Sequence, residues 1–237
     1  MTDTPIVTLS FFRFSRASTR LWALYMMGRA RFSLPRVPNI GFWKLCGSGT
    51  GEGFTPVPNT GVYAILATWP DEASAREQIC HAEIFKTYRR KADEDWTIIL
   101  ETSSARGVWS GRSFDTTGRK LNGPLAALTR ATVKPTAALK FWGRAPAVSR
   151  MIGSDRNVAF KIGIGEVPLL HQVTFSIWPD TKSMATFARE NGAHARAIRA
   201  VREGNWFAEE LYARFAIRGE IGTWGGTSPL NNLKVPV

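Results

Sequence analysis

The sequence predicts an α+β fold: a tandem duplication of a ferredoxin-like βαββαβ unit, with the two sheets packed as a pseudo-dimer of the dimeric α/β-barrel type. Three observations predict this fold. A Trp-Pro-Asp triplet occurs at 69–71 and again at 178–180. Each triplet follows a β-type run and precedes a helical pattern. The chain has 237 residues, which is enough for two small domains.

The first half, residues 1–102, is expected to contain strands at 5–14, 42–48, 62–69 and 95–102, and helices at 17–31 and 71–91. The junction at Trp69, Pro70 and Asp71 supports one of these boundaries. Pro70 lacks the N–H group that a strand ladder requires, so the strand is expected to end there. Asp71 suits the positive end of the helix that follows.

The second half, residues 125–226, repeats this order with strands at 126–134, 157–165, 171–178 and 208–217, and helices at 136–151 and 181–203. Residues 103–124, with their glycines and polar side chains, are expected to form the linker between the halves. Residues 227–237 are expected to form a loosely ordered tail, as chain ends often do.

The chain is strongly basic, with 31 Lys and Arg against 19 Asp and Glu and a formal net charge of +12. A surplus of this size favours an anionic partner, either nucleic acid or membrane headgroups. Ferredoxin-like sheets that bind RNA carry an aromatic strand motif that this sequence lacks, so no nucleic acid is expected as a partner. The apolar run 21–27, flanked by arginines, predicts either a basic helix resting on anionic lipid or a core helix with a solvated rim.

The two cysteines, Cys46 and Cys80, are too few for a disulfide scaffold, and we expect both thiols to be reduced. The N-terminal residues do not have the pattern of a signal peptide. No apolar run reaches the length of a membrane span. These features predict a cytoplasmic protein that is either soluble or in peripheral contact with a membrane.

Several catalytic motifs are absent. The glycine-rich segment 47–53 lacks the spacing of a nucleotide-binding loop, and it predicts a flexible turn or a ligand-contacting loop at a pocket mouth. No G-x-S-x-G motif points to a serine hydrolase, and no paired-histidine motif points to a multi-histidine metal centre. The nine tryptophans and fourteen phenylalanines suit a pocket for a long, flat, apolar molecule.

The three histidines are candidates for a haem ligand. His194 shares one face of a predicted helix with Ala197 and Ile198, and small neighbours allow a flat macrocycle to approach. The alternative for His194 is a hydrogen-bonded core histidine. His81 lies in the matching helix of the first half and is the alternative ligand, and His171 opens a strand and is the weakest candidate.

Distinctive segments extend over nearly the whole chain. They are 20–22 (RLW), 42–44 (FWK), 47–56 (GSGTGEGFTP), 69–72 (WPDE), 128–134 (LTRATVK), 160–168 (FKIGIGEVP) and 197–215 (AIRAVREGNWFAEELYARF). Together they resemble the spheroidene monooxygenase family, and the resemblance is weakest at 103–124. The resemblance implies a haem-dependent monooxygenase that acts on acyclic carotenoids. Such an enzyme introduces a 2-keto group, as from spheroidene to spheroidenone, by successive hydroxylations at C2 with O2 and reduced ferredoxin.

On this hypothesis His194 is the axial ligand of the haem iron, with His81 as the alternative. Arg130 lies in a strand expected to face the interior and is a candidate contact for bound oxygen or a haem propionate; the alternative is a strand-edge arginine facing solvent. The expected location is the cytoplasm, peripheral to the intracytoplasmic photosynthetic membrane. Two other functions stay open: a non-catalytic haem- or carotenoid-binding protein, and a cofactor-free monooxygenase of related fold.

Overall fold

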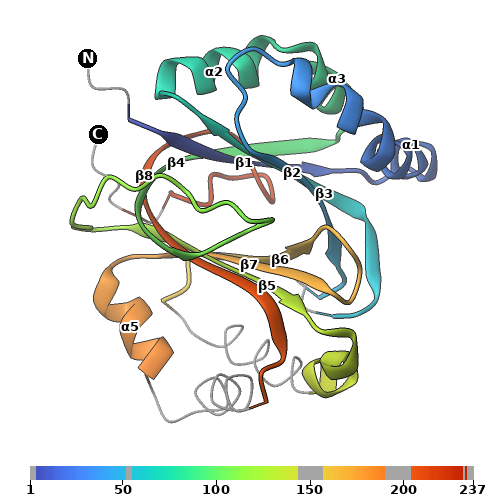
Figure 1. Ribbon diagram of the computed structural model, residues 1–237. Helices are drawn as coiled ribbons and strands as arrows, with labels where there is room; N and C mark the ends of the chain where they lie inside the picture. Colours follow the sequence, from blue (N-terminus) through green and yellow to red (C-terminus); the bar gives the residue numbers. More distant parts are fainter. Residues whose placement is uncertain (1–3, 52–54, 144–156, 190–203, 232, 234–237) are drawn as a thin grey trace.

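The computed structural model describes residues 4–51, 55–143, 157–189, 204–231 and 233. Eight antiparallel strands close into a barrel, and the helices lie outside it (Figure 1). The strands are β1 (Ile6–Arg13), β2 (Trp43–Gly49), β3 (Pro58–Trp69), β4 (Glu94–Gly107), β5 (Leu125–Val133), β6 (Phe160–Gly165), β7 (His171–Trp178) and β8 (Phe207–Gly222). The helices are α1 (Ala17–Arg29), α2 (Glu72–His81), α3 (Glu83–Lys91) and α5 (Thr181–Arg189), with 3-10 turns η1 (Ala30–Phe32), η2 (Leu34–Arg36) and η3 (Pro135–Ala137). The predicted α+β class is confirmed.

The strand order is the same in both halves of the chain. The first half contributes β4-β1-β3-β2 and the second contributes β8-β5-β7-β6 to the barrel. In each half, therefore, the strands follow the order fourth, first, third, second. The halves join where β4 pairs with β8 and β2 pairs with β6, so the two sheets form one continuous wall.

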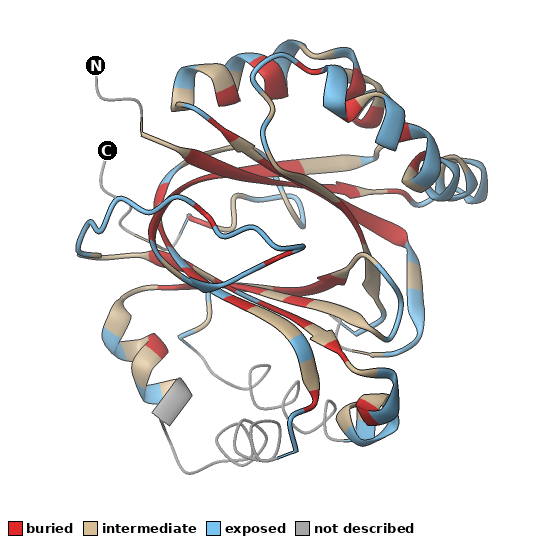
Figure 2. Cartoon of the chain, viewed as in Figure 1, coloured by how far each residue is buried: buried red, intermediate tan, exposed pale blue. Residues whose placement is uncertain are grey.

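Apolar side chains fill the barrel and also cover one outer face. Inside, Val173, Phe175 and Ile177 of β7 are buried at alternate positions, as the period of a strand requires. Outside, α1, α2 and α3 cover the first half and bury Phe12 and Ile65 against it (Figure 2). Strand β1 and the middle of β3 are consequently buried on both faces. Among the described residues, no helix has the length and apolar character needed to cross a bilayer.

The predicted helix at 71–91 is two helices in the structure. The chain is extended at Ala82, between α2 and α3. The guanidinium of Arg89 donates hydrogen bonds to the carbonyls of Ile79 (2.5 Å) and Cys80 (2.8 Å), which α2 leaves without helical partners at its end. The predicted helices at 136–151 and 181–203 lie partly outside the described residues; residues 138–143 and α5 are helical.

The predicted linker and tail both contribute to the barrel core. Strand β4 continues to Gly107, beyond the predicted end at 102. Trp109 and Phe114 of the linker are buried among the interior side chains, and Leu230 of the tail is buried with them. The prediction of a loosely ordered tail is therefore wrong at Leu230. The division of the chain into domains stays a prediction.

Two glycines allow the long strands to end in the same way. After Gly107 (φ +89°), Val108 donates its N–H to the carbonyl of Glu210; after Gly222 (φ +84°), Thr223 donates to the carbonyl of Asp95. A tight turn then begins at Trp109 in one half and at Trp224 in the other.

Replacing Gly107 by alanine is expected to destabilise the protein strongly. The added Cβ would lie 2.1 Å from the Glu210 carbonyl oxygen, at a φ that side chains rarely adopt. Gly111→Ala is the matched control, because it has a similar φ of +74° and open space around the new Cβ. We expect Gly107→Ala to lower the free energy of unfolding by at least about 2 kcal/mol more than Gly111→Ala. Urea denaturation measures both values; equal losses would contradict the close approach.

Candidate functional site

A cluster of charged side chains lies inside one end of the barrel, centred on Arg130. Arg130 lies two residues after the inward-facing Leu128 on β5, so its side chain points to the same face, and the residue is 1% exposed. Its guanidinium forms an ion pair with Glu209, lies 3.8 Å from a carboxylate oxygen of Glu166, and sits 5.6 Å from the ring centroid of Trp109. Among the described residues, its Nε atom is buried without a hydrogen-bond partner. The prediction that Arg130 faces the interior is confirmed.

Glu166 connects most members of this cluster. It directly follows β6, and its carboxylate accepts a hydrogen bond from Trp109 Nε1 (2.6 Å) and forms an ion pair with Lys44 Nζ (2.8 Å). His171 Nδ1 lies 3.5 Å from the same carboxylate. Lys44 also donates to the hydroxyl of Ser110 at 2.6 Å. The carboxylate of Glu166 is therefore held in one position from several sides.

Glu209 fixes the turn that carries Trp109. Its two carboxylate oxygens accept the backbone N–H groups of Ser110 (2.8 Å) and Gly111 (3.0 Å). Burial of Glu209 opposes ionisation, but these hydrogen bonds and the Arg130 charge outweigh it and hold the pKa below the usual 4.5. Glu209 thus stays ionised at neutral pH and keeps Trp109 in the cluster.

Comparison of the two halves shows that the charge on Arg130 is not a requirement of the fold. Leu125 pairs with Trp178 in the second half as Ile6 pairs with Trp69 in the first. Counting five positions onward along each strand, Arg130 in β5 corresponds to Phe11 in β1. Phe11 packs against Trp224 with ring centroids 5.8 Å apart, where Arg130 packs against Trp109.

An apolar aromatic side chain therefore occupies in one half the position that an arginine occupies in the other. A buried ion pair gives little or no net stability compared with apolar packing of similar volume. The barrel accordingly carries this cluster at one end for a reason other than folding, and we take it as the candidate site.

The cluster is electrically balanced at neutral pH. Lys44 and Arg130 contribute two positive charges, and Glu166 and Glu209 contribute two negative charges. Burial is the largest cause that lowers the pKa of His171 below 6.5, and the charges of Arg130 and Lys44 lower it further against the opposing charge of Glu166. Burial also raises the pKa of the Cys46 thiol, which is fully enclosed nearby and stays protonated.

The lowered pKa of His171 predicts a loss of stability in mild acid. The unfolded chain binds the His171 proton more tightly than the folded chain does, so the free energy of unfolding falls as the pH drops through 6.5. The effect is modest because 28% of the side chain is exposed. Urea denaturation at about pH 7.5 and about pH 5.5 measures it. We expect His171→Gln to reduce the difference, with His81→Gln as control; an unchanged difference in His171→Gln would contradict the prediction.

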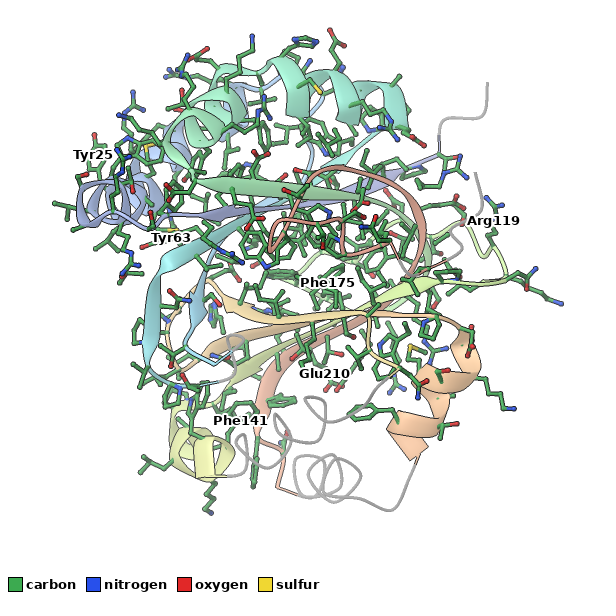
Figure 3. The ribbon with its side chains drawn as sticks, turned by 180° about the vertical axis from the view of Figure 1, so that it is seen from behind. Tyr25, Tyr63, Arg119, Phe141, Phe175 and Glu210 are labelled. Carbon is green, nitrogen blue, oxygen red and sulfur yellow. The ribbon has the colours of Figure 1, made fainter. Side chains whose placement is uncertain are left out.

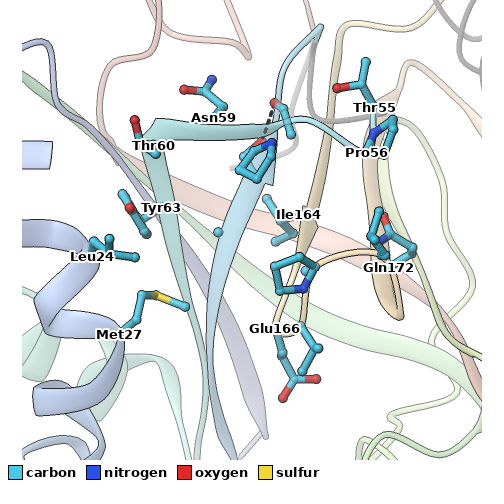
Figure 4. A pocket seen from close by; sticks show the side chains of 18 of the residues that line it. Leu24, Met27, Thr55, Pro56, Asn59, Thr60, Tyr63, Ile164, Glu166 and Gln172 are labelled. Carbon is cyan, nitrogen blue, oxygen red and sulfur yellow. Dashed lines mark hydrogen bonds between the residues drawn. The ribbon is translucent and has the colours of Figure 1, made fainter. Parts of the chain in front are cut away.

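A cavity of about 300 Å³ opens beside the cluster. Leu24 and Met27 of α1 form one wall, the hairpin between β2 and β3 forms another, and the turn after β6 forms the third (Figure 4). The described part of the glycine-rich segment contributes Gly47 and Gly49 to the lining, but both belong to strand β2 and not to the expected turn or loop, and contact with a ligand stays a prediction. Most of the lining is apolar, and Glu166 is the member of the charged cluster that reaches it.

The three predicted histidines have different positions. His171 belongs to the cluster. His81 is exposed at the end of α2, outside the barrel and away from the cavity. His194 lies outside the described residues. Those residues contain no group of three or more His, Cys, Asp or Glu side chains arranged to hold a metal ion.

Sequence reasoning missed Lys44, Trp109, Glu166 and Glu209. One signal was available for Glu209, because it precedes the inward-facing Leu211, Ala213 and Phe215 at alternate positions. A carboxylate on an apolar strand face indicates a buried partner. Trp109 gave no such signal, because its position depends on the turn that Glu209 holds.

Comparison with known proteins identifies the family. No family model matches the sequence. Spheroidene monooxygenase of Cereibacter sphaeroides is 51% identical over 94% of this chain and 70% of its own length. Spheroidene monooxygenase of Rhodobacter capsulatus is 47% identical over 95% of each chain, and that of Rubrivivax gelatinosus is 34% identical over 88% of this chain and 81% of its own.

Solved structures share the fold at much lower identity. A crystal structure of aldoxime dehydratase, in complex with butyraldoxime, aligns with a TM-score of 0.60 over 91% of this chain and 80% of its own, at 9% identity. A second aldoxime dehydratase structure has the same TM-score and covers 82% of its own length. The sequence relationship is the closer guide to activity, and on it the chain is a monooxygenase, an oxidoreductase, that belongs to the spheroidene monooxygenase family.

Proposed function

We propose that this enzyme introduces a 2-keto group into an acyclic carotenoid by two successive hydroxylations at C2, using O2 and electrons from a ferredoxin-type donor. The observation that carries the proposal is the apolar cavity with one fixed carboxylate, Glu166, in its wall, in a chain whose relatives are named spheroidene monooxygenase. An apolar lining suits the hydrocarbon end of the substrate, and the carboxylate suits proton transfer.

We further propose haem as the cofactor, with His194 as the ligand of the iron and His81 as the alternative. The outer face of the second half supports the fit. On the outer face of the first half, four positions hold bulky buried side chains: Phe12, Tyr63, Ile65 and Ile99. The strand register places Ala131, Gln172, Thr174 and Arg214, in the same order, at the equivalent positions of the second half.

The smaller and more polar side chains of this face suit a flat macrocycle better than the bulky set of the first half would, and the exposed Arg214 would supply a cation for haem propionates. Gln172 lies on this face and also lines the cavity, so the cofactor and the substrate would be neighbours. His194 follows α5 in the chain and precedes β8, and both belong to the second half. The position of His81, exposed beyond the first half, gives less support to its role as ligand.

When bound, haem supplies the activation of O2. The residues of the chain supply the rest. The apolar cavity binds the substrate end and excludes water from it. Lys44 and Trp109 hold the carboxylate of Glu166 at the cavity wall, from which it passes protons to the reacting oxygen. Reduction of O2 to water consumes protons at each hydroxylation, and the second hydroxylation gives a geminal diol that loses water to form the ketone.

The charge balance of the cluster helps to judge the two roles expected for Arg130, a contact with bound oxygen and a contact with a haem propionate. Glu166 and Glu209 already neutralise the cluster, so no surplus positive charge remains for a propionate. The buried Nε of Arg130 still lacks a partner among the described residues. Arg130 also faces the interior, opposite the outer face on which the haem is proposed, so this placement supports neither the propionate contact nor the oxygen contact expected for Arg130.

The absorption spectrum of the purified protein tests the haem proposal. After expression with ample haem we expect a Soret band that shifts on reduction and shifts again with carbon monoxide. His194→Ala should remove the band, and His81→Ala, as the matched control, should keep it. A protein without a Soret band even after addition of hemin would support the cofactor-free alternative, and a haem protein without turnover would support the non-catalytic one.

We also infer that the two halves derive from a tandem duplication. The shared strand order, the shared pairing of β1 with β3 and β5 with β7, and the shared turns at Trp109 and Trp224 support this inference. Similar contacts recur at both turns: Glu209 accepts backbone N–H groups of the Trp109 turn, and Glu94 accepts one from the Trp224 turn at 2.7 Å.

A further inference from the structure

Exposed apolar side chains gather around the mouth of the cavity. Ten large apolar side chains of the described residues are well exposed, and eight of them belong to segments that line the cavity or directly continue such a segment. They are Leu21, Leu24, Tyr25, Phe32, Val57, Leu139, Val167 and Leu169. We call this set the mouth face. Figure 3 shows Tyr25, a member of this set on α1, and Phe141, on the helix after η3, on the same side of the molecule as Tyr63.

The cavity itself places these residues together. Leu24, Val167 and Leu169 line it, and Val57 stands between the lining residues Pro56 and Pro58. Leu139, which is 90% exposed, lies in the same short helix as the lining residue Trp142. Five members of the mouth face are thereby placed at one opening, and the others continue α1 and the turn after it.

Helix α1 presents apolar residues on two sides. Ala23 and Met26 are buried against the barrel wall. Leu21, Leu24 and Tyr25, spaced i, i+3 and i+4, form a second stripe that is 69%, 54% and 62% exposed. The first stripe accounts for the packing of the helix. The second stripe has no partner among the described residues and remains available for a further contact.

All charged residues in the segment around this stripe are basic. From Thr4 to Gly51 the sequence has no acidic residue and seven basic ones. Arg29, Arg31 and Arg36 are exposed at the end of α1 and in the turns after it, beside Phe32. Apolar side chains bordered by arginines are the combination that binds an anionic bilayer, with the rings and aliphatic chains among the acyl groups and the guanidiniums at the phosphates.

We propose that the mouth face rests on an anionic lipid bilayer and opens the cavity directly to it. A volume of 300 Å³ is that of about ten water molecules, so it holds only one end of a long polyene. If the substrate is a carotenoid, as proposed above, the rest of it must lie in an apolar medium, and the bilayer provides that medium. A second copy of the chain is a poorer occupant, because two such basic surfaces repel each other.

Sedimentation with lipid vesicles tests the mouth face without any turnover. The probes are vesicles of phosphatidylcholine alone and of equal parts phosphatidylcholine and phosphatidylglycerol. We expect the wild-type protein to sediment with the anionic vesicles and to be released by high salt. Arg29→Gln with Arg36→Gln should weaken the partition about fivefold per arginine. Leu21→Ser with Tyr25→Ser should weaken it roughly tenfold or more.

The controls are exposed residues of β4 and of the turn after it, none of which lines the cavity or belongs to the mouth face. Val108→Ser matches the apolar change, and Arg106→Gln with Arg112→Gln matches the charge change; all three residues are exposed. Both controls should bind as the wild type does, and circular dichroism should show all variants folded.

Three outcomes would overturn the proposal. They are no binding to anionic vesicles by the wild type, equal losses in the mouth-face variants and the controls, or a dimer in solution that the mouth-face variants dissociate without any change in vesicle binding. Because the assay needs no substrate, its result stands apart from that of the proposed function: an inactive protein that still binds would leave the mouth face intact.

Discussion

Replacing Arg130 by methionine is expected to lower the free energy of unfolding by about 3–5 kcal/mol. The side chain is 2% exposed and neutralises two carboxylates, Glu166 and Glu209. Methionine fills much of the same volume but leaves both carboxylates with less compensating charge in a buried site. Urea denaturation at neutral pH measures the loss.

The other half of the barrel supplies a matched control. Arg13 pairs with Glu94 at 2.9 Å and lies over Trp224, but its side chain is 41% exposed. Exposed ion pairs contribute little, so Arg13→Met should cost no more than about 1 kcal/mol. Similar small losses for both variants would contradict the buried cluster, and Arg130→Lys should recover part of the stability by restoring the charge.

Replacing Glu166 by glutamine is expected to reduce ketone formation by a factor of about a hundred or more. The amide keeps the size of the side chain but cannot carry a proton from the cluster to the cavity. Carotenoid products are measured by chromatography after incubation with substrate, reductant and O2. Electron consumption measured alongside should fall less than ketone formation, because protons no longer reach the oxygen in step with electrons.

Glu209→Gln is the control for this prediction. It removes a carboxylate from the same cluster, but Glu209 does not line the cavity. We expect it to lower stability and to keep the ratio of ketone formed to electrons consumed. Glu166→Asp, which retains a carboxylate, should restore part of the ratio. If Glu209→Gln changed that ratio as much as Glu166→Gln does, the role of Glu166 would be structural.

Local features of the sequence predicted most of the elements. Strand and helix patterns depend on neighbouring residues, and β1, α1, β2, β5 and β7 lie within two residues of their predicted ends. The position of Arg130 was also predictable, because strand periodicity alone places it on the inward face. The break between α2 and α3 was not, because it depends on a hydrogen bond from Arg89 back to α2.

Most of the candidate site depends on contacts between distant segments. Glu166 becomes part of it only because β6 pairs with β2 and brings the carboxylate to Lys44. Trp109 becomes part of it only because Glu209, a hundred residues later in the chain, holds its turn. Neither contact has a signature in the residues around Glu166 or Trp109, so a single sequence does not reveal the cluster.

Labelling with ¹⁸O2 shows whether the enzyme transfers oxygen from O2 to the carotenoid. The purified enzyme is incubated with spheroidene, a ferredoxin-type reducing system and ¹⁸O2, and the carotenoids are analysed by mass spectrometry. We expect a 2-keto product that carries ¹⁸O from the gas, with an intermediate 2-hydroxy carotenoid at early times. Unchanged spheroidene, from a folded and haem-loaded protein, or a ketone whose oxygen comes only from water, would contradict it.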